Sequence, residues 1–388
     1  MGPLNGFKII EIAGIGPSQL CGMLLADMGA QVLRIDRPGE LDPGIAMPAK
    51  FNLMNRSRPT VEVDLKQPEG VSLVLQLCAD ADALFEGFRP GVMEKLGLGP
   101  DACQAKNPRL VYGRITGWGQ EGPLADAAGH DTNFIALSGA LHSIGDADRP
   151  PPLPLNLIGD FGGGALYLAM GMLAAMLEAS RSGQGQVVDA AMVDGVASMM
   201  TLFYGLLAGG RWQDRRQSNL LDGAAPFARS YQTSDGGFIA LCALENRFFR
   251  NLLEALEIDD IDPADQYRFQ DWPRHTALFT EAIAAKTRQQ WAETLETRDC
   301  CAAPVLSLSE APEHPHLKAR GTYVTVDNIV QPAPAPRFSR TPSSTPSAPQ
   351  EPGVDAQQAL MDWGLSEPEL DDLAQEGVLG SGPAAAAS

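Results

Sequence analysis

The first 117 residues alternate between short apolar runs and longer amphipathic segments, and this alternation restricts the possible folds more than any other feature of the sequence. FKIIEIAG at 7–14 and QVLRID at 31–36 are typical of buried strands. PSQLCGMLLADMGA at 17–30 lies between them and predicts a helix, with proline at its first position and glycine near its end. The pattern continues to LVYGRITG at 110–117. Strands that alternate with helices form parallel sheets with right-handed crossovers, so we expect an α/β protein whose large domain is a doubly wound parallel sheet.

The order of the elements changes after a long apolar helix expected at 162–185, which we predict to be buried because it is apolar on nearly all sides. SYQTSDGGFIALCAL at 230–244 has the pattern of an antiparallel hairpin, and helical patterns follow it. Such an order is typical of a smaller α+β domain. We expect a large α/β domain at 1–190 completed by the segment 335–388, a linker helix at 191–227, the small α+β domain at 228–312 and a return linker at 313–334.

Charge and composition restrict the partners and the compartment. The net charge of −19 argues against nucleic-acid and anionic-membrane partners. The longest charge-free apolar run, at 195–210, is shorter than the ~20 residues that span a bilayer, so we expect one buried helix there. The six cysteines form no C-x-x-C pair and have no adjacent histidine cluster, which predicts reduced core thiols and no metal site. With no signal-peptide pattern at the start, we expect a cytoplasmic protein.

A phosphate-bearing ligand is indicated by the N-terminal third, which carries 12 basic and 13 acidic residues in its first 120 positions. The dinucleotide fingerprint G-x-G-x-x-G fails because Gln19 stands where its last glycine belongs, which disfavours a nicotinamide dehydrogenase. Basic residues instead recur around the predicted strands, where ligands of open α/β sheets collect, and guanidinium groups suit phosphate oxygens. These residues are Arg34, Arg37, Arg56, Arg58, Lys66 and Arg89.

Two ionisable residues precede predicted helices. His130 lies in AGHDTNF, and Asp160 lies in GDFGGG. Each has a structural alternative: a hydrogen-bonded structural histidine, and a helix N-cap. Three glycines in a first helical turn cost about 1 kcal/mol each, so we expect a ligand to approach the backbone closely at 162–164.

These motifs, together with EIAGIGPSQLCGMLLADMGAQVLRIDRPG and PLNLIGDFGGGALYLAMGML, resemble the α-methylacyl-CoA racemases, a branch of the family III CoA-transferase superfamily. The resemblance covers about residues 6–325. It implies the large and small domains expected above in an interlocked homodimer. It also implies an enzyme that interconverts (2R)- and (2S)-2-methylacyl-CoA thioesters by proton transfer through an enolate. No metal or separate cofactor is implied, because CoA is part of the substrate.

The resemblance also implies roles for individual residues. His130 and Asp160 would be the two bases, and Glu245 would support the histidine, although an acid at a helix start is equally explained by the helix dipole. The Asp131 N–H would donate to the enolate oxygen. Contacts to the CoA phosphates and adenine fall on Arg37, Val63, Asp64, Leu65, Lys66 and Arg89, and the acyl thioester would lie along Gly129, Asp131, Thr132, Asn133 and Phe134.

Two other functions remain open at this point. A CoA-transferase of the same superfamily would use Asp160 as a nucleophile that forms covalent intermediates, but it has no use for a second base at His130. A binding protein for acyl-CoA would need neither residue to transfer protons. The methionines of MVDGVASMMTLFYGLL could form an adaptable pocket wall or plain core.

Overall fold

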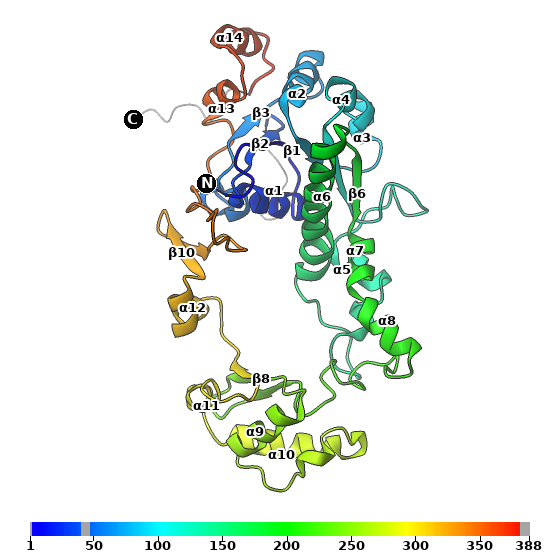
Figure 1. Ribbon diagram of the computed structural model, residues 1–388, viewed down its shortest axis with the longest axis vertical. Helices are drawn as coiled ribbons and strands as arrows, with labels where there is room; N and C mark the ends of the chain where they lie inside the picture. The colour runs from blue at the N-terminus through cyan, green and yellow to red at the C-terminus, as the bar shows by residue number, and fades with distance from the viewer. Residues whose placement is uncertain (1, 40–46, 381–388) are drawn as a thin grey trace. The chain divides into compact units, whose positions relative to one another are not determined.

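The computed structural model describes residues 2–39 and 47–380, which divide into two compact units (Figure 1). Among the described residues, the first unit holds 2–39, 47–138, 154–199 and 318–380. The second unit holds 139–153 and 200–317.

A parallel sheet forms the centre of the first unit, as the sequence predicted, and it has six strands. Its order is β3-β2-β1-β4-β5-β6. The chain therefore leaves β1 in one direction and continues from β4 in the other, so the topological switch point lies between β1 and β4. The strands are β1 (Lys8–Ile12), β2 (Gln31–Asp36), β3 (Thr60–Glu62), β4 (Ala83–Glu86), β5 (Val111–Thr116) and β6 (Val187–Ala191).

Two apolar layers cover the sheet, because successive side chains of a strand point to opposite faces. On β1, Ile10 belongs to a core with the C-terminal helices and α2, whereas Ile9 belongs to a core with α1 and α6. Figure 1 shows these helices around the sheet. The helices of this unit are α1 (Pro17–Asp27), α2 (Pro68–Asp80), α3 (Val92–Lys95), α4 (Pro100–Lys106), α5 (Asp131–Leu137), α6 (Leu166–Ser182), α7 (Met192–Met199), α13 (Ala356–Asp362) and α14 (Glu367–Gln375).

The second unit contains a three-stranded antiparallel sheet with helices packed on it. The predicted hairpin is present, with β7 paired to β8 and β8 to β9. An aromatic core that includes Phe227, Phe249, Phe279 and Trp291 joins the sheet to its helices. The elements are β7 (Ser230–Gln232), β8 (Phe238–Leu241), β9 (Ala302–Pro304), α8 (Thr201–Ala208), α9 (Asn246–Ala255), α10 (Trp272–Ala284) and α11 (Arg288–Leu295).

Short elements complete the chain. The helix α12 (Pro315–Arg320) spans the point in the sequence where the second unit ends, and the hairpin of β10 (Tyr323–Val326) and β11 (Ile329–Pro332) follows it. Single 3₁₀ turns lie at η1 (Ala49–Phe51), η2 (Leu53–Asn55), η3 (Leu141–Ser143), η5 (Pro263–Asp265), η6 (Phe269–Asp271) and η7 (Ala311–Glu313).

The boundaries of the units differ from the predicted domains at several places. The predicted linker 191–227 is divided, with 191–199 in the first unit and 200–227 in the second, and the start of the predicted return linker, 313–317, lies in the second unit. Two further differences are explained by hydrogen bonds. The stretch 139–153 belongs to the second unit, because the Arg216 guanidinium donates hydrogen bonds of 3.2 Å to the carbonyls of His142, Asp146 and Arg149. The β10–β11 hairpin, expected in a return linker, belongs to the first unit. Arg56 binds it by donating to the Gln331 side chain at 2.8 Å and to the Pro332 carbonyl at 2.7 Å.

Two predictions about apolar segments are wrong. The run at 195–210 forms two helices, α7 and α8, and α8 contains no buried residue. The long helix expected to be buried leaves Leu166, Met170 and Leu177 between 53% and 59% exposed. Together with the π-helical residues before it, this helix spans Leu157–Ser182 and is long and apolar enough to cross a membrane, a test that core helices also pass. Apolar composition alone does not distinguish a core helix from one with an uncovered face.

The prediction that all six cysteines are core thiols is also wrong in part. Cys242 and Cys301 are exposed, whereas Cys21, Cys78, Cys103 and Cys300 are buried. All six are free.

Candidate active site

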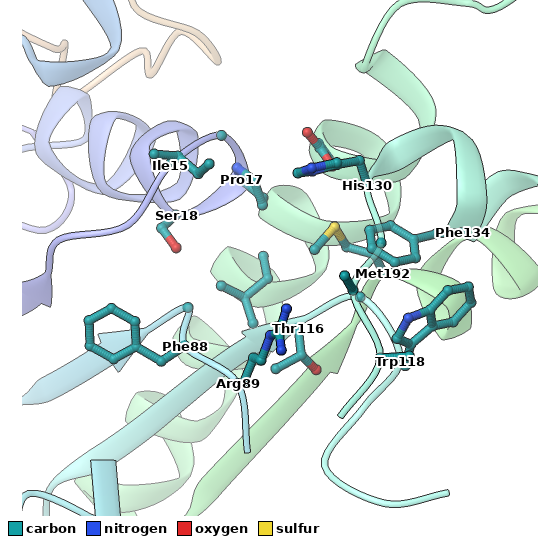
Figure 2. Close-up of a pocket in the computed structure, with 18 of the residues that line it drawn as sticks. Ile15, Pro17, Ser18, Phe88, Arg89, Thr116, Trp118, His130, Phe134 and Met192 are labelled. Atoms are coloured by element: carbon teal, nitrogen blue, oxygen red, sulfur yellow. The ribbon is translucent and has the colours of Figure 1, made fainter. Parts of the chain in front are cut away.

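A cavity of about 410 Å³ lies where β1, β4 and β5 end in the first unit, next to the topological switch point. Ligands of open α/β sheets bind at this position. Figure 2 shows the start of α1 on one side of the cavity and His130, Phe134 and Met192 on the other. Its lining also includes Gly129 and Asp160, so the structure brings both proposed bases to one cavity.

Hydrogen bonds hold the backbone of His130, whereas its imidazole ring makes none within the described part of its unit. The His130 N–H donates to the Asn133 side chain at 3.0 Å, and the Asn133 N–H donates to the His130 carbonyl at 2.8 Å. The ring is exposed and has no hydrogen-bond partner among the described residues of the first unit. In Figure 2 it extends toward Pro17 at the start of α1. His130 is therefore available to a ligand rather than occupied as a structural histidine.

Asp160 lies within a stretch of π-helix, η4 (Leu157–Ala165), and is not the N-cap that the structural alternative required. π-Helical turns are rare in proteins, and those that occur often lie at functional sites. The Asn156 amide donates to the Asp160 carboxylate at 3.3 Å. Burial raises the pKa of Asp160 above its ordinary value, and the charge of Asp131 raises it further, while the Asn156 bond and the nearby His130 oppose the rise. A half-buried carboxyl with a raised pKa is suited to proton transfer.

The glycines after Asp160 make room for helix packing, and the prediction that they admit a ligand is wrong. A Cβ on Gly163 would lie 2.9 Å from the Met192 carbonyl oxygen and 2.7 Å from the Val196 side chain, both on α7. On the other side of this contact, a Cβ on Gly195 would lie 1.9 Å from the Gly163 oxygen. None of Gly162, Gly163 and Gly164 lines the cavity.

The start of α1 forms the wall of the cavity beside Asp160. Gly16 has a φ of 62°, and a Cβ there would lie 3.3 Å from the Asp160 Oδ2. The Ser18 hydroxyl lines the cavity although Ser18 is only 1% exposed. Helix geometry leaves the N–H groups of the first turn without intrahelical acceptors, so this wall presents donors to a bound ligand.

Among the described residues, Arg89 is the one arginine predicted to bind CoA that lines the cavity. Its loop follows β4 and is held by Glu86, which accepts a hydrogen bond from the Phe88 N–H at 2.7 Å. Glu86 is buried and paired with Arg114 at 3.1 Å, and burial raises the pKa of Glu86. Sequence reasoning missed Glu86, Arg114 and Asn156. Glu86 accepts from Phe88 of the cavity lining, Arg114 pairs with Glu86, and Asn156 donates to Asp160, and no sequence pattern predicts these contacts.

Three arginines that we assigned to the phosphate site are buried in ion pairs, so that part of the prediction is wrong. Arg34 pairs with Glu11 at 2.6 Å and with Asp36 at 2.9 Å. The pair of Arg58 is also with Glu11, and Arg56 pairs with Asp27 at 2.5 Å. Their side chains are at most 5% exposed and hold β1, β2 and α1 to the segment after η2. None of the three lines the cavity.

The other predicted adenine and phosphate contacts lie outside the cavity lining. Arg37 is exposed after β2, close to residues 40–46, which are outside the described residues. Val63 is fully buried, and its N–H and that of Asp64 already donate to the carbonyls of Asp36 and Val378. Leu65 packs against the core, and Lys66 is exposed. The roles of these residues stay predictions.

Within the stretch predicted to hold the thioester, Gly129 and Phe134 line the cavity with His130, whereas Asp131, Thr132 and Asn133 do not. Phe134 meets Trp118 edge to face, with ring centroids 4.8 Å apart, and Figure 2 shows the pair at one end of the cavity. Glu245 precedes α9 in the second unit, so its support of His130 stays a prediction. The described residues contain no group of three or more His, Cys, Asp or Glu side chains that could hold a metal ion.

Comparison with known proteins identifies relatives over nearly the whole chain. The sequence profile of CoA-transferase family III matches residues 4–357. The chain is 39% identical to the α-methylacyl-CoA racemase of Mus musculus over 381 residues and 38% identical to that of Homo sapiens over 383 residues, covering 97% of this chain and 98% of each relative. It is 31% identical to the succinyl-CoA–D-citramalate CoA-transferase of Chloroflexus aurantiacus, again over 97% of this chain and 98% of the relative. A CAIB/BAIF family protein from Brucella suis superimposes with a TM-score of 0.78 at 26% identity, covering 93% of this chain and 99% of that one.

Proposed function

The chain belongs to CoA-transferase family III, and we propose that it is a racemase that interconverts (2R)- and (2S)-2-methylacyl-CoA thioesters. The observation that carries this proposal is the pair of His130 and Asp160 on one cavity. A transferase needs a nucleophile at Asp160 but no second base. The chain is 38–39% identical to two α-methylacyl-CoA racemases over 97% of its length, and this similarity supports the same conclusion.

The proposed reaction moves one proton on each side of C2. His130 takes the α-proton of one enantiomer, and the electron pair of the C–H bond moves into the thioester carbonyl to form an enolate. Asp160, protonated, then donates its proton to the opposite face of the same carbon. In the reverse direction the two residues exchange roles. The raised pKa of Asp160 supports this scheme, because a fraction of its carboxyl groups stays protonated at higher pH than in an ordinary aspartate.

The enolate needs a donor for its oxygen, and we propose the Asp131 N–H for this role. Asp131 itself is absent from the cavity lining, but its N–H begins α5 directly after His130, which lines the cavity. Because α5 has only seven residues, this stabilisation comes from individual N–H groups rather than from a long helix dipole. We assign Arg89, Arg37 and the segment 63–66 to the CoA phosphates and adenine. The CoA group is part of the substrate, and the scheme uses no other cofactor.

We further propose that the enzyme is a cytoplasmic homodimer without membrane or nucleic-acid partners. The net charge of −19 supports the exclusion of nucleic acid and anionic membranes as partners. Two uncovered apolar surfaces support self-association. One is formed by Leu166, Met170 and Leu177 on α6, and the other by Leu202, Tyr204 and Leu207 on α8.

Racemisation in the absence of any acceptor acid tests the proposal against the transferase alternative. A single enantiomer of a 2-methylacyl-CoA should become a mixture of both, and the Asp160 peptide should stay unmodified in mass spectra after turnover with hydroxylamine or borohydride. A hydroxamate or a reduced side chain at Asp160, with no change of configuration in the substrate, would assign the chain to the transferases instead.

A further inference from the structure

We propose that the Asp131 carboxylate is a positioning residue that holds Asp160 at the cavity and tunes its proton transfers, independently of the Asp131 N–H. This inference rests on the proposed two-base function. It gives one residue two separate tasks, because the main chain of Asp131 belongs to α5 whereas its side chain binds η4.

One oxygen of Asp131 links the backbones of the two proposed bases, His130 and Asp160. Asp131 Oδ2 accepts a hydrogen bond from the Gly159 N–H at 2.6 Å and a second from the Asp160 N–H at 2.8 Å. Asp131 directly follows His130 in the chain. The backbone of one base is therefore linked to the backbone of the other by a single side chain, and the distance between the two bases depends on that side chain.

The surroundings of Asp131 make this link rigid. Asp131 is only 5% exposed, so water cannot replace a lost partner of the two N–H groups. A Cβ on Gly159 would lie 2.6 Å from Oδ2, and glycine is what lets the carboxylate approach so closely. Hydrogen bonds to a charged acceptor are shorter and stronger than neutral ones, and buried N–H groups that lose their acceptor are costly. Loss of the carboxylate should therefore shift the start of η4.

Asp131 affects Asp160 through its negative charge, in addition to its hydrogen bonds. Its other oxygen, Oδ1, is buried with no hydrogen-bond partner among the described residues. Burial is the main reason that the pKa of Asp160 is raised, and the negative charge of Asp131 raises it further, whereas the Asn156 amide and His130 lower it. Among the described residues, the polar and charged neighbours that act on the Asp160 carboxyl are Asp131 at the start of α5, His130 just before it, and Asn156 just before η4. Removing the charge of Asp131 should therefore lower the pKa at which Asp160 loses its proton.

The experiment measures α-deuterium exchange in deuterium oxide for each enantiomer of a 2-methylacyl-CoA separately, across pH. His130→Ala and Asp160→Ala first identify which enantiomer reports on which base. In Asp131→Ala the exchange that depends on Asp160 should fall about 10- to 100-fold more than the exchange that depends on His130, since a displacement near 1 Å can cost about 10²-fold. Asp131→Asn keeps an acceptor oxygen, so the exchange that depends on Asp160 should be largely retained. The acidic limb of its pH profile, where the exchange rate falls as Asp160 becomes protonated, should move to lower pH.

Asp126→Asn is the matched control, because Asp126 is an exposed carboxylate in the same segment that does not line the cavity. It should leave both exchange rates and the acidic limb unchanged. If Asp131→Ala does not fold, the pH profile of Asp131→Asn decides the matter. Equal losses for both enantiomers, or an unmoved acidic limb in Asp131→Asn, would overturn the inference. If His130→Ala and Asp160→Ala fail to separate the enantiomers, the proposed two-base function itself fails, whatever Asp131 does.

Discussion

Replacing Gly163 by alanine tests whether the glycine-rich turn after Asp160 serves helix packing or ligand access. The added Cβ would lie 2.9 Å from both the Met192 carbonyl oxygen and the Val196 nitrogen, which are backbone atoms of α7 and cannot rotate away. Overpacking of this kind costs about 1–3 kcal/mol, against a helix-propensity gain of up to about 1 kcal/mol. The turn must then move away from α7 and take Asp160 with it.

We expect Gly163→Ala to lower the unfolding temperature by several degrees, at roughly 2–4 °C per kcal/mol for a domain of 150–250 residues. The exchange that depends on Asp160 should fall at least tenfold in kcat, with little change in the KM for acyl-CoA. Calorimetry and steady-state kinetics measure these effects. The matched control is Gly205→Ala on α8, where an added Cβ meets nothing within 4 Å, so stability and rate should be unchanged or slightly higher.

A different result would refute the packing argument. If Gly163→Ala keeps its unfolding temperature and its kcat but raises KM, the glycine makes room for the ligand, as the sequence alone suggested. A variant that is unchanged in all three quantities would show that the backbone contacts between η4 and α7 relax at no cost.

Three further predictions follow from the ion pairs and the site. Arg89→Ala and Arg37→Ala should each raise the KM for acyl-CoA about tenfold, because a charge-assisted contact contributes about 1.5–3 kcal/mol, and an unchanged KM would remove that arginine from the CoA site. Glu11→Gln should lower the free energy of unfolding in urea by about 3–5 kcal/mol, since it breaks buried pairs with Arg34 and Arg58, and a loss below about 1 kcal/mol would show that these pairs are dispensable. Asp160→Asn should be more stable than the wild type at pH 7, because a carboxyl whose pKa is raised by folding destabilises the fold when ionised. That difference should shrink as the pH falls through the raised pKa, and a difference that is constant with pH would contradict the sign of the shift.

The parallel sheet and the importance of the segments around His130 and Asp160 could be predicted from the sequence because local patterns indicate them. Alternating strands and helices indicate a parallel sheet, although not its strand order, and the segments before α5 and around η4 carry recognisable motifs. The strand β6 was missed because Val187–Ala191 is short and includes the polar Asp189, so its apolar run is interrupted.

The arginines show where such reasoning fails. Arg34, Arg58 and Arg89 all accompany strands, yet two are buried against Glu11 and one lines the cavity. Whether an arginine meets a carboxylate of the protein or the phosphate of a ligand depends on side chains that are distant in sequence. The same holds for Asp131, whose carboxylate binds N–H groups 28 and 29 residues away.

The central claim is that His130 and Asp160 each serve one enantiomer, and α-deuterium exchange by the two alanine variants tests it most directly. We assign His130 to the 2S thioester and Asp160 to the 2R thioester. His130→Ala should lose net racemisation by about 10²-fold or more and still exchange the 2R substrate slowly, while the 2S substrate stays inert. Asp160→Ala should show the opposite preference. If both variants exchange both enantiomers at rates near that of the wild type, the two-base account is wrong.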